Sequence, residues 1–151
     1  MTRHAVLAMD RTLWPFTIEY CGVQKRLDTK ETTEFVSRTQ DSLRYLRRKG
    51  YSVHLATRCT NRKMATRLLD MYYSGDEKKD ERPLFDSVIF DASEHKLRHL
   101  EYIVPNREHP FIFFDSNQTT LRKVNTIYPN ALVCHSKNLH EVCGDKSDDL
   151  H

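Results

Sequence analysis

Short apolar runs of strand length alternate with helical patterns along this chain. Five such runs lie at residues 5–9, 51–56, 84–90, 111–114 and 131–134. Continuous apolar runs of this length are typical of strands that are buried on both faces, as in a parallel sheet. The polar residues that follow the first, second and fourth runs therefore stand at the ends of predicted strands.

Amphipathic segments between these runs predict four helices, the first from about residue 32 to 49. Their apolar faces consist of Phe35, Val36, Leu43 and Leu46; Met64, Leu68, Met71 and Tyr72; Leu97, Leu100 and Val104; and Leu121, Val124 and Tyr128. Gly50 can end the first helix, and Pro105 and Pro129 close the last two. A strand followed by a helix, repeated, predicts an α/β fold with a three-layer, doubly wound parallel sheet and right-handed crossovers.

Residues 16–27 interrupt this alternation. Strand-forming residues on both sides of Cys21-Gly22 predict a small β-hairpin soon after the first strand. Residues 74–83 form a charged surface loop in this interpretation, and residues 144–151 form a polar tail. Because the chain has no internal repeat and no low-complexity linker, we expect one domain over residues 1–143.

Composition is that of an ordinary globular protein. The 151 residues are 38% apolar and 30% charged, and a chain of this length can bury a real core. No run of about 18 apolar residues occurs, so we expect no membrane span, and the start of the chain has no secretory cleavage pattern. The cysteines are Cys21, Cys59, Cys134 and Cys143. Their spacing includes no CxxC pair and no zinc-type pattern, which favours reduced thiols in a cytoplasmic protein.

Net charge gives little support to a nucleic-acid partner. The formal charge of +3 is small for such a function. Basic residues cluster on two predicted helices, as Arg44, Arg47, Arg48 and Lys49 on the first and Arg62, Lys63 and Arg67 on the second. Cations at a helix C-terminus are favourable for the helix dipole, so the first cluster needs no nucleic acid to explain it.

Polar side chains gather at the predicted carboxyl ends of the strands, where ligands bind in such sheets. They are Asp10 and Thr12 after the first strand, Thr57 and Arg58 after the second, Lys96 near the start of the helix after the third, and Asp115, Ser116 and Asn117 after the fourth. Carboxylates suit a hard cation such as Mg²⁺, and a lysine balances phosphoryl charge. Each residue alone is better explained as a helix cap, a turn residue or a solvated charge. Together, in this order, they favour a phosphate and metal site.

Residues 9–16, Met-Asp-Arg-Thr-Leu-Trp-Pro-Phe, resemble the first motif of the magnesium-dependent phosphatase family, a branch of the haloacid dehalogenase (HAD) superfamily. That motif is Asp-x-Asp-x-Thr followed by Leu-Trp-Pro-Phe. The resemblance continues through residues 56–58 (second motif), Lys96 (third) and residues 113–115 (fourth), and covers nearly the whole chain. It implies a Rossmann-like HAD fold with a minimal cap, in which the hairpin at 16–27 is the flap.

The resemblance also implies a two-step phosphoryl transfer through an aspartyl-phosphate. By position, Asp10 is the acid and base, and its main-chain carbonyl is a magnesium ligand. Thr57 hydrogen-bonds the phosphoryl oxygens, with Arg58 as a further phosphate-binding candidate. Lys96 neutralises the nucleophile and the phosphate. Asp115 ligates the metal, which offsets charge in the transition state.

Ala8 occupies the position of the nucleophilic aspartate in this motif. A methyl group can neither attack phosphorus nor coordinate a cation. We therefore expect the chain to be catalytically dead or severely impaired, with a weakened magnesium site. Ser116 in place of a second acidic residue at the fourth motif is a milder departure. Both an engineered Asp-to-Ala change and a natural pseudophosphatase are compatible with Ala8.

Two functions follow from this reasoning. The first is a phosphatase scaffold for phosphomonoesters that is inactive as written. The second is a pseudophosphatase, a non-catalytic module that recognises a phosphorylated small molecule, a phosphoprotein or another protein partner through the same cleft. The aromatic side chains of Trp14 and Phe16 either line that cleft or belong to the core, and we favour the core.

Overall fold

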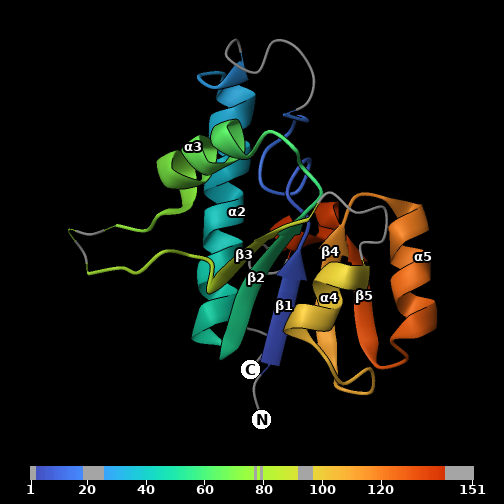
Figure 1. Ribbon diagram of the computed structural model, residues 1–151. Coiled ribbons are helices and arrows are strands. Elements are labelled where there is room, and N and C mark those ends of the chain that lie inside the picture. Colours follow the sequence, from blue (N-terminus) through green and yellow to red (C-terminus); the bar gives the residue numbers. More distant parts are fainter. Residues whose placement is uncertain (1–2, 19–25, 77, 79, 92–96, 142–151) are drawn as a thin grey trace.

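A computed structural model describes residues 3–18, 26–76, 78, 80–91 and 97–141 of the chain (Figure 1). Its strands are β1 (Arg3–Leu7), β2 (Tyr51–Thr57), β3 (Ser87–Phe90), β4 (Phe111–Asp115) and β5 (Ala131–His135). Its helices are α2 (Lys30–Arg48), α3 (Arg62–Tyr73), α4 (Leu97–Ile103), α5 (Gln118–Ile127) and the 3₁₀ helix η2 (Ser136–His140). The strands form one parallel sheet in the order β3-β2-β1-β4-β5. The predicted doubly wound α/β fold is confirmed.

The sheet separates two apolar cores, because alternate side chains of its strands point to opposite faces. On one face, Ala5 and Leu7 pack with the buried sides of α2 and α3. On the other face, Val6 packs with residues of α4 and α5, such as Leu100 and Val124. Figure 1 shows the two pairs of helices on opposite sides of the sheet. This arrangement leaves the carboxyl ends of the strands as one shared edge.

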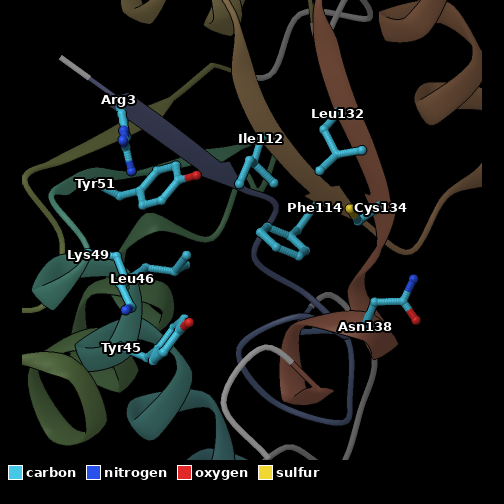
Figure 2. A pocket seen from close by; sticks show the side chains of 10 residues that line it. All are labelled: Arg3, Tyr45, Leu46, Lys49, Tyr51, Ile112, Phe114, Leu132, Cys134 and Asn138. Atoms are coloured by element: carbon cyan, nitrogen blue, oxygen red, sulfur yellow. The ribbon is translucent and has the colours of Figure 1, made fainter. Parts of the chain in front are cut away.

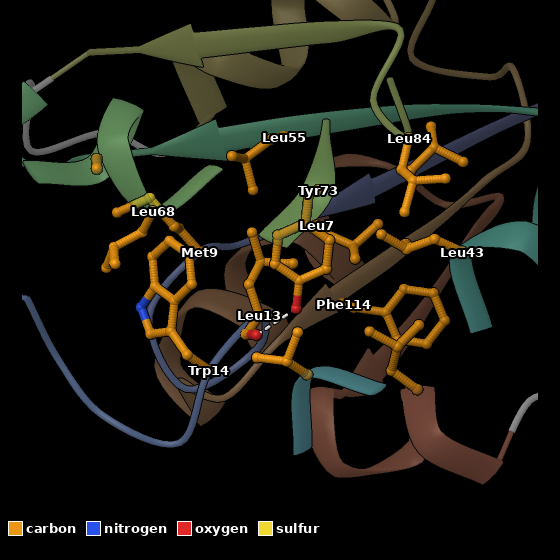
Figure 3. Packing of buried hydrophobic residues seen from close by; sticks show 14 of the residues in the cluster. Leu7, Met9, Leu13, Trp14, Leu43, Leu55, Leu68, Tyr73, Leu84 and Phe114 are labelled. Carbon is orange, nitrogen blue, oxygen red and sulfur yellow. Dashed lines mark hydrogen bonds between the residues drawn. The ribbon is translucent and has the colours of Figure 1, made fainter. Parts of the chain in front are cut away.

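The segment that follows β1 belongs to the core rather than to the surface. Leu13, Trp14 and Phe16 are all buried in the same cluster as Leu7, and Figure 3 shows Leu13 and Trp14 beside Tyr73 of α3. The hydroxyl of Tyr73 donates a hydrogen bond to the carbonyl oxygen of Leu13. The prediction that Trp14 and Phe16 are core residues is confirmed.

Three details of the predicted elements are wrong. The edge strands β3 and β5 are not buried on both faces, since Val88 is 40% and Leu132 is 60% exposed. Met71 was placed on the buried face of its helix, but it is 49% exposed. Met71 lies about 120° around the helix from the buried Ala65, since successive residues are about 100° apart. The buried aromatic residue near the end of this helix is Tyr73. The third strand begins at Ser87 rather than at residue 84, because the Asp86 carboxylate takes the place of a ladder partner and accepts from the N–H of Val53 over 2.7 Å.

Ion pairs of the first basic cluster fasten α2 to the loop before β3. Arg44 donates two hydrogen bonds to Glu81, at 2.9 and 3.1 Å, and this contact raises the pKa of the arginine. Arg47 pairs with Asp86 over 3.0 Å. These two cations are engaged by the protein's own carboxylates, so Arg44 and Arg47 serve the fold.

Several predictions concern residues beyond the described part. Lys96, residues 19–25 of the predicted hairpin, the tail at 144–151, and two of the four cysteines all lie outside it. Cys59 and Cys134, which are described, are free thiols. Among the described residues, none of the helices combines the length and apolar character that crossing a membrane requires.

Two histidines meet on the α4/α5 face of the sheet. The Nδ1 of His4 and the Nε2 of His54 are 3.0 Å apart, and the other ring nitrogen of His54 is 2.7 Å from the hydroxyl of Ser87. Burial, and then the charge of His4, lowers the pKa of His54, although Asp86 opposes the shift. Burial, and then His109, lowers the pKa of His4. Protonation of this pair is therefore unfavourable in the folded state.

We predict that the free energy of unfolding falls as the pH drops below about 6.5, because the unfolded chain then binds protons that the folded pair excludes. Urea unfolding over a series of pH values measures this slope, and His54→Gln should flatten it. His135→Asn is the matched control, since it removes an imidazole but keeps an acceptor for the Lys137 N–H at the start of η2. Identical slopes in all three proteins would contradict the assignment.

Candidate functional site

Ala8 is the first residue beyond β1 and lies at the carboxyl edge of the sheet. Leu7 pairs with Phe114 of β4 in parallel register, and the N–H of Ala8 donates to the Phe114 carbonyl over 2.9 Å. Ala8 is therefore level with Asp115, the last residue of β4. Its side chain is 4% exposed. Ala8 therefore lies at the carboxyl edge, where the resemblance places the nucleophile, but its side chain is only a methyl group.

Asp10 holds the turn that follows β1. Its Oδ1 atom accepts from the indole N–H of Trp14 over 2.9 Å and from the backbone N–H of Ile18 over 3.2 Å. Arg11, the next residue after Asp10, has a left-handed backbone with φ of 60°. This conformation costs a non-glycine residue about 1 kcal/mol or more. The hydroxyl of Ser136 donates to the Arg11 carbonyl over 3.2 Å and supports that conformation.

The turn role of Asp10 leaves room for chemistry. A carboxylate has two oxygens with about four lone-pair sites, and the hydrogen bonds from Trp14 and Ile18 both reach one of them, Oδ1. Both donors have fixed positions, because the indole of Trp14 is buried and the N–H of Ile18 belongs to the main chain. Fixed donors orient the carboxylate, and orientation is what a general acid or base requires. The sequence did not reveal Trp14 as the partner of Asp10.

Thr57 ends β2 on the same edge of the sheet. It is buried, and its hydroxyl oxygen accepts from the N–H of Cys59 over 3.0 Å. The hydroxyl hydrogen is a separate group that can donate. Thr57 does not cap the next helix, because Asn61 does so by accepting from the N–H of Met64. Arg58, directly after Thr57, is exposed.

Asp115 is a buried carboxylate at the end of β4. It is 5% exposed, and its Oδ1 accepts from the N–H of Asn117 over 2.9 Å. Asn117, rather than Asp115 or Ser116, caps α5, since its side chain accepts from the N–H of Thr120. Burial of a carboxylate is costly unless it is hydrogen-bonded or paired with a cation. Asp115 meets this condition through the N–H of Asn117, and its carboxylate offers hard oxygen atoms that could hold a metal ion at this edge.

Asp91 is a further polar residue at this edge that the sequence analysis did not select. It follows β3 directly, and its N–H donates to the Thr57 carbonyl over 3.0 Å. Its own carbonyl oxygen is 2.8 Å from the Nε2 of the buried His99 in α4. Its place directly after the apolar run at 84–90 is the sequence feature that could have identified it. Lys96, which the resemblance assigns to the same region, lies outside the described residues.

The donor set at this edge fits magnesium only in part. Asp10 and Asp115 supply hard oxygen ligands, and Mg²⁺ is often held by one or two carboxylates together with several waters. Within the described ranges, however, no group of three or more His, Cys, Asp or Glu side chains could hold a metal ion. Ala8, which is level with Asp115, offers a methyl group and no ligand atom in its side chain. The residues are suited to a hydrated Mg²⁺ with few protein ligands.

Comparison with known proteins identifies the fold. A scan against protein-family models finds no match, and a search of curated proteins finds none either. Among solved structures, the chain is similar to the N-terminal part of the protein BF1531 from Bacteroides fragilis, which contains a phosphatase domain and was crystallised with Mg. The TM-score is 0.52 at 15% identity, over 88% of this chain and 35% of the other. This chain thus spans about a third of the length of that crystallised part, and the likeness shows a shared fold.

We predict that Asp10→Ala lowers the free energy of unfolding by about 1–3 kcal/mol, because the buried indole N–H of Trp14 loses its acceptor. Asp10→Asn keeps an acceptor oxygen and should cost clearly less. Urea unfolding followed by the fluorescence of Trp14, the single tryptophan of the chain, measures both. If the two substitutions cost the same, Asp10 does not hold the turn through these hydrogen bonds.

Proposed function

We propose that this chain is a magnesium-dependent phosphatase scaffold of the HAD type, acting on phosphomonoesters, with its nucleophile replaced by Ala8. The observation that carries the proposal is the place of Ala8. It lies beside Asp115 at the carboxyl edge of the sheet and two residues before Asp10. The likeness of the fold to a phosphatase domain complexed with Mg supports the same reaction class.

With an aspartate at position 8, the reaction would proceed in two steps. That carboxylate attacks phosphorus, the aspartyl-phosphate forms, and Asp10 protonates the leaving oxygen. Asp10 then removes a proton from the water that hydrolyses the intermediate. The hydroxyl of Thr57 donates to a phosphoryl oxygen, and the resemblance gives Lys96 the charge-balancing role. Asp115 and the main-chain carbonyl of Asp10 would hold a magnesium ion, which would offset phosphoryl charge when bound.

As written, the chain has a methyl group at position 8, where the resemblance places the group that forms the covalent intermediate. The resulting loss should be large, because removal of a catalytic nucleophile commonly costs about 10³-fold or more in rate. The position is otherwise intact, since Ala8 keeps its backbone hydrogen bond to β4. We therefore expect hydrolysis to fail at the chemical step rather than at folding.

The same edge supports a second function, binding of a phosphoryl group without hydrolysis. Replacing a carboxylate by a methyl group removes like charge from the place where a phosphate dianion would lie, and like charges at short distance repel strongly where solvent is scarce. Ala8 therefore favours retention of a phosphorylated ligand by Thr57 and Arg58. In this form the protein is a pseudophosphatase whose partner is a phosphorylated small molecule or a phosphoprotein.

We predict that Ala8→Asp gains magnesium-dependent hydrolysis of p-nitrophenyl phosphate, by about 10³-fold or more over the unaltered chain. Ala8→Asn is the matched control, because it has nearly the same size but no nucleophilic carboxylate, and it should stay inactive. Circular dichroism of all three proteins checks the fold, since the new side chain enters a nearly buried position.

Calorimetry with inorganic phosphate separates the two proposed functions. Tighter binding by the unaltered chain than by Ala8→Asp, together with turnover by Ala8→Asp, is expected for an inactivated phosphatase. Phosphate binding without turnover in any variant would leave only the binding module. A folded, magnesium-saturated Ala8→Asp protein that neither binds phosphate nor hydrolyses the ester would contradict both.

A further inference from the structure

A groove of about 310 Å³ lies between α2 and η2, on the sheet face that α2 packs against (Figure 2). Its floor is the surface of β4 and β5, formed by Ile112, Phe114 and Cys134. Tyr45 of α2 lines one side, and Asn138 of η2 lines the other. A volume of this size is at the lower end of small-molecule sites, and it holds a molecule of about a dozen non-hydrogen atoms at protein packing density.

The floor of this groove is apolar and incompletely covered. Leu132, on β5, is 60% exposed although its neighbour across the sheet, Ile112, is partly buried in the core. α2 covers the side of β2, whereas η2 has only five residues and covers little of β5. Burial of an aliphatic or aromatic group against this surface would be favourable, because it removes apolar area from water on both sides.

Two cations stand at the mouth of the groove. The guanidinium of Arg3 lies 5.9 Å from the centre of the Tyr51 ring, and the ammonium of Lys49 lies 5.6 Å from the centre of the Tyr45 ring. Among the described residues that line the groove there is no aspartate or glutamate. Burial raises the pKa of the Cys134 thiol, which keeps it uncharged at neutral pH. The groove is therefore apolar inside and positive at its rim.

We propose that this groove binds a small organic anion with an apolar body, of the class of medium-chain or arylalkyl carboxylates. The body lies on Phe114 and Leu132, and the carboxylate lies between Arg3 and Lys49. This complementarity selects against neutral apolar molecules, which lack a partner for the cations, and against inorganic anions, which lack the apolar body. The cationic rim lies far from the carboxyl edge, because Tyr51 and Thr57 stand at opposite ends of β2, about 20 Å apart at the usual rise of a strand. The floor reaches Phe114, whose side chain points to the opposite face of the sheet from that of its neighbour Asp115.

Isothermal titration calorimetry of the full chain with octanoate tests the proposal, with octanamide as the neutral probe. Octanoate should bind about tenfold more tightly than octanamide, as expected for a charge-assisted contact. The double substitution Arg3→Gln/Lys49→Gln should remove most of that difference and leave octanamide binding nearly unchanged. Arg122→Gln/Lys123→Gln is the matched control, since it removes the same charge from exposed positions of α5 on the other side of the sheet.

Three results would overturn the proposal. Equal affinity for octanoate and octanamide would mean that the rim cations do not select the ligand. Equal losses in the two double variants would reduce the effect to net charge. A dimer in sedimentation velocity that does not bind octanoate would make the groove an interface with a second copy of the chain. Thermal melting of each variant checks that it is folded at the titration temperature.

Discussion

Parallel pairing of β1 with both β2 and β4 holds the sheet together at its centre. The strand is hydrogen-bonded on both sides and buried on both faces, so its end is fixed relative to its neighbours. The backbone of Ala8 continues this pairing for one more residue through Phe114. The chain then turns sharply, and Asp10 stabilises the turn by accepting from Trp14 and Ile18. A backbone geometry of this kind does not depend on which side chain stands at position 8.

The sequence was most informative where one physical constraint acts alone. Apolar runs located all five strands, and the carboxyl edge followed from the topology. Burial on both faces explains the runs of β1, β2 and β4, but not those of the edge strands β3 and β5, where Val88 and Leu132 are exposed. The start of β3 could not be located in this way, because the Asp86 carboxylate replaces a backbone partner in the ladder. The hydrogen bond between Trp14 and Asp10 could not be predicted either, since their spacing in the sequence does not indicate a hydrogen bond in a turn. The groove depends on how much of the sheet α2 and η2 leave uncovered, and only the folded structure shows that.

β4 links the two regions to which we assign ligands. Phe114 forms part of the floor of the groove, and Asp115, the next residue, belongs to the carboxyl edge. Successive side chains of a strand point to opposite faces, so one short segment contributes to two different surfaces. Their chemistry differs accordingly, with carboxylates and hydroxyls at the edge and aromatic and aliphatic groups under a cationic rim in the groove. The ion pairs of Arg44 and Arg47 lie away from both and serve to fasten α2 to its loop.

The methyl group of Ala8 also has a consequence for how such a chain can change over generations. An active centre that crowds carboxylates together is held at some expense of stability, and losing one of them commonly makes a protein more robust. Ala8 packs beside Asp115 without a second negative charge to repel it. A scaffold in this state can tolerate destabilising substitutions that an active relative could not. Mutational drift would then be freest on its exposed surfaces, where single substitutions cost the least stability.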